Sequence, residues 1–347
     1  MIGCDPVPPN HLFIQFTVLY FFQMKSPNKP IGIFYEHHVW FKPLFEELQR
    51  RNIPFVRINA AQSQFNPQER DAPYSLVVNR VSSSAYLRGN VQGIFYTANF
   101  LNHIERLGIP VVNGTFAQEI ETSKARQLGL IASLGLFFPK TRVINHISQL
   151  LSAAKSLRFP VLLKPNVGSH GAEILKFDTT QKLQRAIDLH QINLGVDHST
   201  LVQEFIPPKG GYIVRVETLN GKFLYAIKIF PKGNNFNFSA AELQDIRTAS
   251  KESEGLSGRI RVESFIPERK IIDDVERIVK AARLDAGGVE YLLHPETNEP
   301  YYYDINALSN FIGQAEDVIG FNPHEAFVDY LEQRLQPVYE IEHKPLV

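Results

Sequence analysis

The sequence predicts an α/β protein whose C-terminal half is α+β. Two observations lead to this fold class. Between residues 29 and 113, short apolar runs alternate with stretches of helical periodicity. After residue 203, apolar β runs follow one another with only tight turns between them. Strands separated by helices form parallel sheets, whereas strands joined by tight turns form antiparallel sheets.

The first region is expected to form a small open parallel α/β domain over residues 29–113. Its pattern predicts strands at 30–35, 53–59, 74–81 and 109–114, and helices at 41–52 and 91–108. It has no G-x-G-x-x-G fingerprint, so a dinucleotide site is not expected. Arg80 and the serines Ser82–Ser84 follow the third strand, where open sheets bind ligands. A structural role for these residues is the favoured interpretation.

The second region, residues 114–337, is expected to hold two lobes that divide near 203–210. Its first lobe is predicted to contain helices at 121–135, 147–158 and 179–192 and strands at 138–144, 159–164 and 201–206. In its second lobe, Asn220-Gly221 predicts a hairpin within 212–230, because this dipeptide favours a two-residue turn. Two further β runs at 287–293 and 300–306 flank a polar turn, and a helix follows at 323–335.

Composition excludes several classes of function. Lysine plus arginine and aspartate plus glutamate both number 36, so no basic excess indicates nucleic acid or an anionic membrane as a partner. Cys4 is the only cysteine, which excludes an intrachain disulfide and fits a cytoplasmic location. The apolar run His11–Phe22 is shorter than the about 20 residues of a membrane span. Residues 1–28 and 338–347 are expected to be tails outside the fold, and homo-oligomerisation is left open.

A lysine beside a loop of small residues is the first candidate for chemistry. The run Phe159–Glu173, FPVLLKPNVGSHGAE, is an apolar strand that ends at Lys164 and continues into a loop with Gly168, Ser169 and Gly171. A buried lysine needs a partner, and small residues let the backbone approach a ligand closely. Both features are typical of a phosphate site.

Charged residues in the two β pairs are the second candidate. With a two-residue turn, Arg215 is expected opposite Ala226, which places Lys228 on the same face as Arg215. If the second turn closes symmetrically around Thr297, Glu290 lies opposite Asp304, and Asn306 shares the face of Asp304. Carboxylate and amide oxygens suit Mg²⁺ held together with nucleotide phosphates.

In their order along the chain, these residues resemble the ATP-grasp superfamily, most closely its α-glutamate ligases and peptide-modifying carboxylate–amine ligases. The resemblance covers about residues 30–335 and also includes ETSKARQLGLIASLG, which holds Lys124. It implies an ATP-grasp fold, with an N-terminal parallel domain and a C-terminal nucleotide-binding region of antiparallel sheets. Two departures are Asp304, where the family motif E-x-N has glutamate, and ALSN at 307–310, where SSPG usually follows.

The resemblance also implies residue roles. Phosphates and adenine of ATP would be bound by nine positions: Lys124, Lys164, Gly168, Ser169, Gly171, Gln203, Glu204, Phe205 and Ile206. Arg215 and Lys228 would be catalytic cations. Glu290, Asp304 and Asn306 would hold Mg²⁺, with Mn²⁺ as an alternative.

The expected activity is ATP-dependent, Mg²⁺-dependent amide formation between a carboxylate and an amine, small molecules or peptides, through an acyl phosphate. Two alternatives stay open: an ATP-grasp phosphotransferase that acts on a hydroxyl, and a non-catalytic ATP-binding protein. The polar segment 231–259 is expected to be mobile without ligand and to close over bound substrates.

Overall fold

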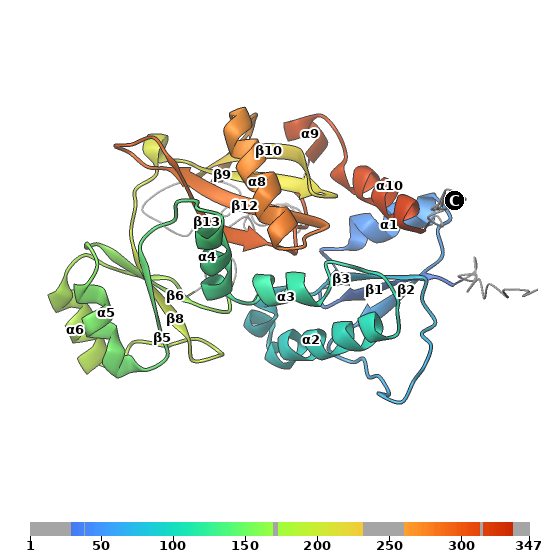
Figure 1. Cartoon of the computed structure of the whole chain (residues 1–347), viewed down its shortest axis with the longest axis horizontal. Helices are drawn as coiled ribbons and strands as arrows, with labels where there is room; N and C mark the ends of the chain where they lie inside the picture. Colours follow the sequence, from blue (N-terminus) through green and yellow to red (C-terminus); the bar gives the residue numbers. More distant parts are fainter. Residues whose placement is uncertain (1–28, 38, 169–172, 232–259, 313–314, 336–347) are drawn as a thin grey trace, which may run out of the picture.

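The computed structural model describes residues 29–37, 39–168, 173–231, 260–312 and 315–335, which form three sheets with helices around them (Figure 1). The expected segment 231–259 lies outside the described residues, apart from its first position. Ser169 and Gly171 of the predicted phosphate loop also lie outside them. The expected parallel and antiparallel sheets are both present, while the domain boundaries expected from the sequence stay a prediction.

The N-terminal sheet is parallel throughout, in the order β2-β1-β3-β4. Its strands are β1 (Ile31–Tyr35), β2 (Phe55–Asn59), β3 (Leu76–Arg80) and β4 (Val111–Val112). Helices α1 (Lys42–Arg50) and α2 (Val91–Arg106) connect them, and the 3₁₀ helix η1 (Ser83–Arg88) follows β3. Strands β1 and β3 are buried along their whole length, as expected for central strands of a covered parallel sheet.

The central sheet is antiparallel, in the order β5-β8-β6-β7. It consists of β5 (Thr141–Ile144), β6 (Val161–Pro165), β7 (Leu175–Phe177) and β8 (Thr200–Glu204). Its helices are α5 (Leu150–Lys155), preceded by the 3₁₀ turn η2 (Ile147–Gln149), and α6 (Thr180–Asp188). Leu150, Leu163, Leu183 and Val202 form the core between these helices and the sheet.

The C-terminal sheet is antiparallel, in the order β11-β10-β9-β12-β13. Its strands are β9 (Ile213–Leu219), β10 (Lys222–Pro231), β11 (Ile260–Phe265), β12 (Ala286–Leu293) and β13 (Pro300–Asn306). The 3₁₀ turn η3 (Lys209–Gly211) precedes β9. The predicted hairpin is confirmed: Asn220 and Gly221 have φ angles of 51° and 69°, the conformation that a type I′ turn requires.

Each face of this sheet packs against different helices. One face contacts α4 (Lys124–Ser133) and α8 (Arg269–Ala281), with Val216 and Val289 in that core. The other face packs against α10 (Pro323–Leu335) and the N-terminal sheet, with Ile213 and Ile227 in that core (Figure 1). Two short helices, α3 (Thr115–Glu121) and α9 (Ala315–Ile319), complete the described structure. No helix within the described ranges is long and apolar enough to cross a bilayer.

Asn113 joins the N-terminal sheet to the C-terminal sheet. Its side-chain amide donates to the carbonyl oxygens of Ala286 and Ala307, and its oxygen accepts from the backbone N–H groups of Asp285 and Ala286. The residue is 1% exposed and has φ 54°. Asparagine tolerates this left-handed conformation better than most residues.

We expect Asn113→Ala to lower the free energy of unfolding by at least about 3 kcal/mol, because several buried backbone groups lose their partner. Asn298→Ala is the matched control, since Asn298 also has a positive φ of 61° but lies in an exposed turn. The control should lose only about 1–2 kcal/mol, the cost of the left-handed backbone. Urea denaturation measures both, and equal losses would show that the buried bonds of Asn113 add nothing.

Candidate active site

Three predicted cationic residues come from three separate elements. Lys124 begins α4, Lys164 lies on β6, and Arg215 lies on β9. Asn166 brings the two lysines together, because its carbonyl oxygen accepts from Lys124 N at 3.1 Å and its Oδ1 accepts from Ala125 N at 2.9 Å. The start of α4 is thereby fixed beside the end of β6. Ser123 caps the helix, accepting from Arg126 N.

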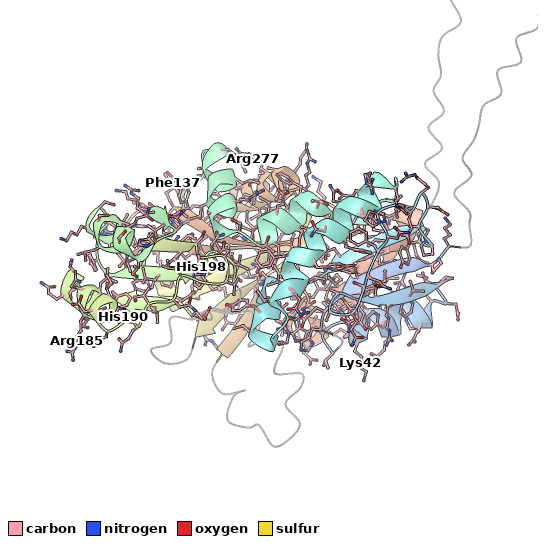
Figure 2. All side chains as sticks on the ribbon, turned by 90° about the horizontal axis from the view of Figure 1, so that it is seen from below. Lys42, Phe137, Arg185, His190, His198 and Arg277 are labelled. Carbon is pink, nitrogen blue, oxygen red and sulfur yellow. The ribbon has the colours of Figure 1, made fainter. Side chains whose placement is uncertain are left out.

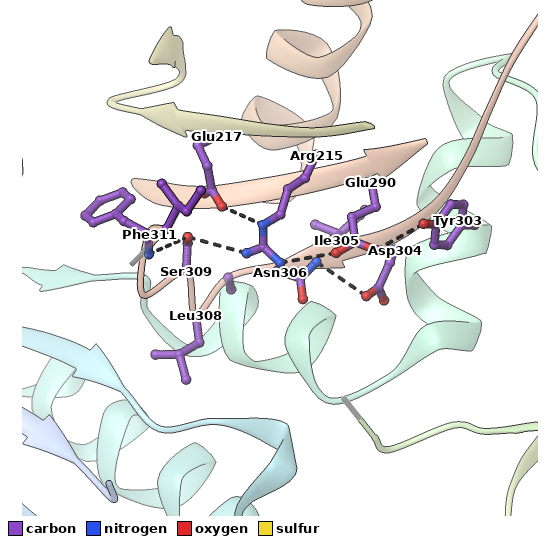
Figure 3. A network of polar contacts seen from close by, with 12 residues as sticks. Arg215, Glu217, Glu290, Tyr303, Asp304, Ile305, Asn306, Leu308, Ser309 and Phe311 are labelled. Carbon is purple, nitrogen blue, oxygen red and sulfur yellow. Dashed lines mark hydrogen bonds and ion pairs between the residues drawn. The ribbon is translucent and has the colours of Figure 1, made fainter. Parts of the chain in front are cut away.

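The predicted carboxylate pair is confirmed. Glu290 on β12 lies directly opposite Asp304 on β13, and Arg215 lies opposite Glu290 on the other side. Asn306 follows two residues after Asp304, and its amide donates to Asp304 Oδ2 at 3.3 Å. Cation, carboxylates and amide therefore form a row across three neighbouring strands (Figure 3).

Each of these carboxylates is paired with a cation of the protein itself. Lys124 Nζ donates to Asp304 Oδ1 at 2.5 Å, and Arg215 Nη1 donates to Glu290 Oε1 at 3.2 Å. Other charged side chains, such as Lys42, Arg185 and Arg277, project from the periphery of the molecule (Figure 2). The site residues Glu290 and Arg215 are only 3% and 7% exposed. Buried ions of this kind are stable only when they are paired.

Burial and neighbouring charges shift the pKa values in opposite directions. Burial raises the pKa of Glu290 to about 7, and the negative charge of Asp304 adds to that rise, while Arg215 opposes it. Burial also acts to raise the pKa of Asp304, but the charge and hydrogen bond of Lys124 outweigh it, and the net shift is downward. Asp304 therefore stays ionised as the strongest anion of the row.

The oxygen atoms of the row are of the type that Mg²⁺ prefers, but they do not form a preformed metal site. Among the residues that the structure describes, no cluster of three or more histidine, cysteine, aspartate or glutamate side chains is arranged to hold a metal. The two carboxylates are occupied by Lys124 and Arg215 instead. Asp304 Oδ2, which among the described residues accepts only from the Asn306 amide at 3.3 Å, is the oxygen of Asp304 that would be open to a metal ion.

Lys164 is 9% exposed, and its ammonium lies 5.2 Å from the ring centroid of Tyr303. Burial, together with the positive charge of Lys124, lowers the pKa of Lys164 to about 8. Asp304 and Glu290 oppose this shift through their charge alone, because no ion pair of Lys164 is present in the described parts of the chain. A nearby anion would restore a stably charged Lys164.

The predicted adenine-binding stretch Gln203–Ile206 ends β8 and continues beyond it. Two of its side chains have structural partners: Gln203 Nε2 donates to Thr141 Oγ1 at 2.9 Å, and Glu204 Oε1 accepts from Arg158 N at 2.9 Å. The ammonium of Lys176 lies 4.3 Å from the ring centroid of Phe205. Any contact of Gln203 and Glu204 with a base is therefore expected from the backbone. Gly168 is buried where β6 leads into the phosphate loop.

The predicted register of the first hairpin is wrong. A bulge at Leu224, between Phe223 and Tyr225, shifts the pairing, so that Arg215 lies opposite Ile227 rather than Ala226. A one-residue shift moves a side chain to the other face of the sheet. Lys228 consequently shares its face with Val214, and its ammonium lies 4.5 Å and 4.3 Å from the rings of Tyr212 and Phe265. The structure does not bring Lys228 to the row.

Sequence reasoning missed four polar residues that support the row: Glu121, Glu217, Tyr303 and Ser309. Glu121 accepts from Ser83 Oγ and from Ala307 N at 2.9 and 2.7 Å. Glu217 Oε1 accepts from Arg215 Nε at 2.5 Å, and Tyr303 Oη donates to Glu290 Oε2 at 3.1 Å. Ser309 Oγ accepts from Arg215 Nη2 at 3.4 Å (Figure 3). Strand alternation could have indicated Glu217, two residues after Arg215.

Arg80 makes contacts within the fold, in agreement with the structural role favoured from the sequence. It is 2% exposed, its Nη2 donates to the carbonyl oxygen of Ser309, and its guanidinium lies 5.3 Å from the rings of both Phe41 and Phe327. It thus connects the end of β3 to the segment that follows β13.

Comparison with known proteins finds relatives that are similar in sequence and in fold. Residues 121–251 match the model of the RimK-like ATP-grasp domain. A probable alpha-L-glutamate ligase of Thioalkalivibrio sulfidiphilus (strain HL-EbGR7) is 25% identical over 249 residues, 70% of this chain and 74% of that protein. Another of Marinomonas sp. (strain MWYL1) is 26% identical over 156 residues, 45% of this chain. That match spans about half of the relative's length, 48%.

Solved structures agree on the fold. The ATP-grasp ligase PsnB, complexed with its minimal precursor, has a TM-score of 0.62 at 17% identity, with 88% of this chain and 100% of PsnB covered. The D-alanine–D-alanine ligase of Bacillus anthracis, complexed with ATP, has a TM-score of 0.61 at 14% identity, with 88% and 96% covered. The chain therefore has the ATP-grasp fold, and its residues 121–251 are similar to the RimK-like ATP-grasp domain.

Proposed function

We propose that the protein is an ATP-dependent carboxylate–amine ligase that forms an amide through an acyl phosphate. One observation carries the proposal: Lys124, Lys164 and Arg215 converge from three elements on the Glu290–Asp304 pair. Phosphoryl transfer is mostly a matter of positioning reactants and neutralising charge, and this row supplies charges of both signs in a buried setting.

Each residue of the row, and each of the two lysines beside it, has a role in the proposed reaction. Lys124 and Lys164 bind the phosphates of ATP. Arg215 stabilises the negative charge that develops as the substrate carboxylate attacks the γ-phosphate. Glu290, Asp304 and Asn306 would hold Mg²⁺, which neutralises phosphate charge when bound. PsnB, which shares the fold, was solved with Mg and ADP.

The relatives suggest the first substrates to examine. Several of them are named probable alpha-L-glutamate ligases, and PsnB was solved with a precursor peptide. We therefore infer that one substrate is an amino acid, with L-glutamate first, and that the other is a small molecule or a peptide. Release of ADP from ATP, screened over amino acids and peptides with hydroxylamine present to trap an acyl phosphate as hydroxamate, tests this directly. A phosphorylated hydroxyl product would indicate a phosphotransferase instead.

We expect Asp304→Ala to reduce turnover at least about 100-fold, because the row loses its strongest anion and the partner of Lys124. Asp178→Ala is the matched control, since Asp178 also pairs with a lysine, Lys182, at 2.6 Å but lies on the surface. The control should keep full activity. ADP release at saturating Mg²⁺ measures both variants, and near-normal turnover of Asp304→Ala would remove the row from the mechanism.

We expect kcat/KM for ATP to fall as the pH rises through about 8, the pKa of Lys164. Below this pH the ammonium is charged and attracts phosphate, and above it the amine is neutral. Lys164→Arg keeps its charge at all these pH values and should move the fall to higher pH. Lys182→Arg, a change on the exposed face of α6, should leave the profile unchanged. A wild-type profile that stays flat from pH 7 to 9 would contradict the assignment.

A further inference from the structure

Glu217 is a buried carboxylate beside the row, and only one of its two oxygens contacts a residue of the row. The side chain is 2% exposed, and its Oε1 accepts from Arg215 Nε. Its Oε2 is buried and has no hydrogen-bond partner among the described residues. A buried acceptor without a donor is unfavourable, so such groups generally have a partner in the working state of a protein.

The strand register places this carboxylate inside the site. Gly288 on β12 lies opposite Glu217 on one side and opposite Asn306 on the other. A Cβ atom at Gly288 would lie 2.9 Å from Glu217 Oε2 and 3.0 Å from Oε1. The carboxylate therefore lies over the glycine, in the space that a side chain would fill. Since strands are about 4.8 Å apart, it lies one strand from Asn306 and adjoins Arg215 (Figure 3).

Two cations lie near the carboxylate of Glu217 and favour its negatively charged form. Arg215 contacts it directly, and Arg80 interacts with it through its charge. A carboxylate without a proton only accepts hydrogen bonds. The partner of Oε2 must therefore be a donor or a cation, and it must reach the point where Arg215 stabilises the reacting group.

We propose that Glu217 Oε2 binds the ammonium of the amine substrate and takes up its proton, so that Glu217 is the general base of amide formation. The proposal rests on the ligase function proposed above. Oε2 accepts one proton from the ammonium, which leaves a lone pair on nitrogen. The amine then forms the C–N bond with the acyl carbon as the bond from this carbon to the phosphate oxygen breaks. The second proton leaves with the phosphate, and Glu217 returns its own to solvent.

Glu217→Gln tests this role, because glutamine can still accept from Arg215 Nε but cannot take up a proton. Two nucleophiles separate the steps: hydroxylamine, which is largely unprotonated at neutral pH, and methylamine, which is largely protonated, with L-glutamate as a third amine. We expect the variant to form hydroxamate at nearly the wild-type rate and to use methylamine and L-glutamate at least 50-fold more slowly. Glu217→Asp, which keeps a carboxylate, should recover part of that loss.

Several results would overturn the proposal. Equal losses with hydroxylamine and methylamine would show that Glu217 only holds Arg215. A raised Mg²⁺ requirement would show that it binds metal instead. Unchanged rates, or a wild-type protein that forms hydroxamate but no amide with either protonated amine, would also contradict it. A wild-type protein that forms no hydroxamate with any carboxylate would instead refute the ligase function itself.

Two controls support the reading of these rates. Thermal unfolding of each variant shows whether it is folded at the assay temperature. If Glu217→Gln is not folded, Glu217→Asp serves instead, and its shorter carboxylate should then slow methylamine and L-glutamate, by less than 50-fold, while hydroxylamine keeps the wild-type rate. Glu276→Gln removes another acidic group that is paired with a cation, Lys222 at 2.9 Å, on the α8 face of the sheet. It should use hydroxylamine and methylamine at wild-type rates.

Discussion

Opposite charges buried on one face of the C-terminal sheet are the constraint on which the rest of the structure depends. Isolated ions in such a setting cost several kcal/mol each, and pairing only partly offsets this cost. Strands β9, β12 and β13 supply Arg215, Glu217, Glu290 and Asp304, and Lys124 from α4 pairs with Asp304. Helix α4, the central sheet and the N-terminal sheet are consequently held where their polar groups contact this face.

The same pairing explains how a charged site can exist without ligand. Asp304 and Glu290 are neutralised by cations that are themselves candidates for phosphate binding. Nucleotide with its metal would then exchange partners within the site rather than enter an uncompensated charge cluster. Such an exchange requires that each ion pair contribute little net free energy to the stability of the fold, as is usual for buried ion pairs. Arg215, held on three sides by Glu217, Glu290 and Ser309, is the cation least able to move.

Much of this arrangement could be predicted from the sequence, because it depends on local rules. Periodicity and turn residues predicted the parallel N-terminal sheet and the two antiparallel strand pairs of the C-terminal sheet, but not β7, β11 or α8. Glu290 lies opposite Asp304 as expected, although the turn is not symmetric around Thr297: Leu293 pairs with Pro300, and a bulge after Tyr302 restores the expected pairing. The bulge at Leu224 could not be foreseen, and it moved Lys228 to the other face. Ser309 and Glu121 could not be foreseen either, because their role depends on which distant backbone groups approach them. Glu217 was overlooked, although its position two residues from Arg215 predicts that both side chains lie on the same face of the strand.

In the proposed reaction a substrate carboxylate attacks the γ-phosphate of ATP, and the amine then displaces phosphate from the acyl phosphate. Transfer of ¹⁸O from a labelled carboxylate substrate tests both steps. We expect one ¹⁸O atom in the inorganic phosphate released during amide formation, because the carboxylate oxygen that attacked the γ-phosphate leaves with it. Unlabelled phosphate, or ¹⁸O retained wholly in the organic product, would contradict an acyl phosphate and with it the function proposed for this protein.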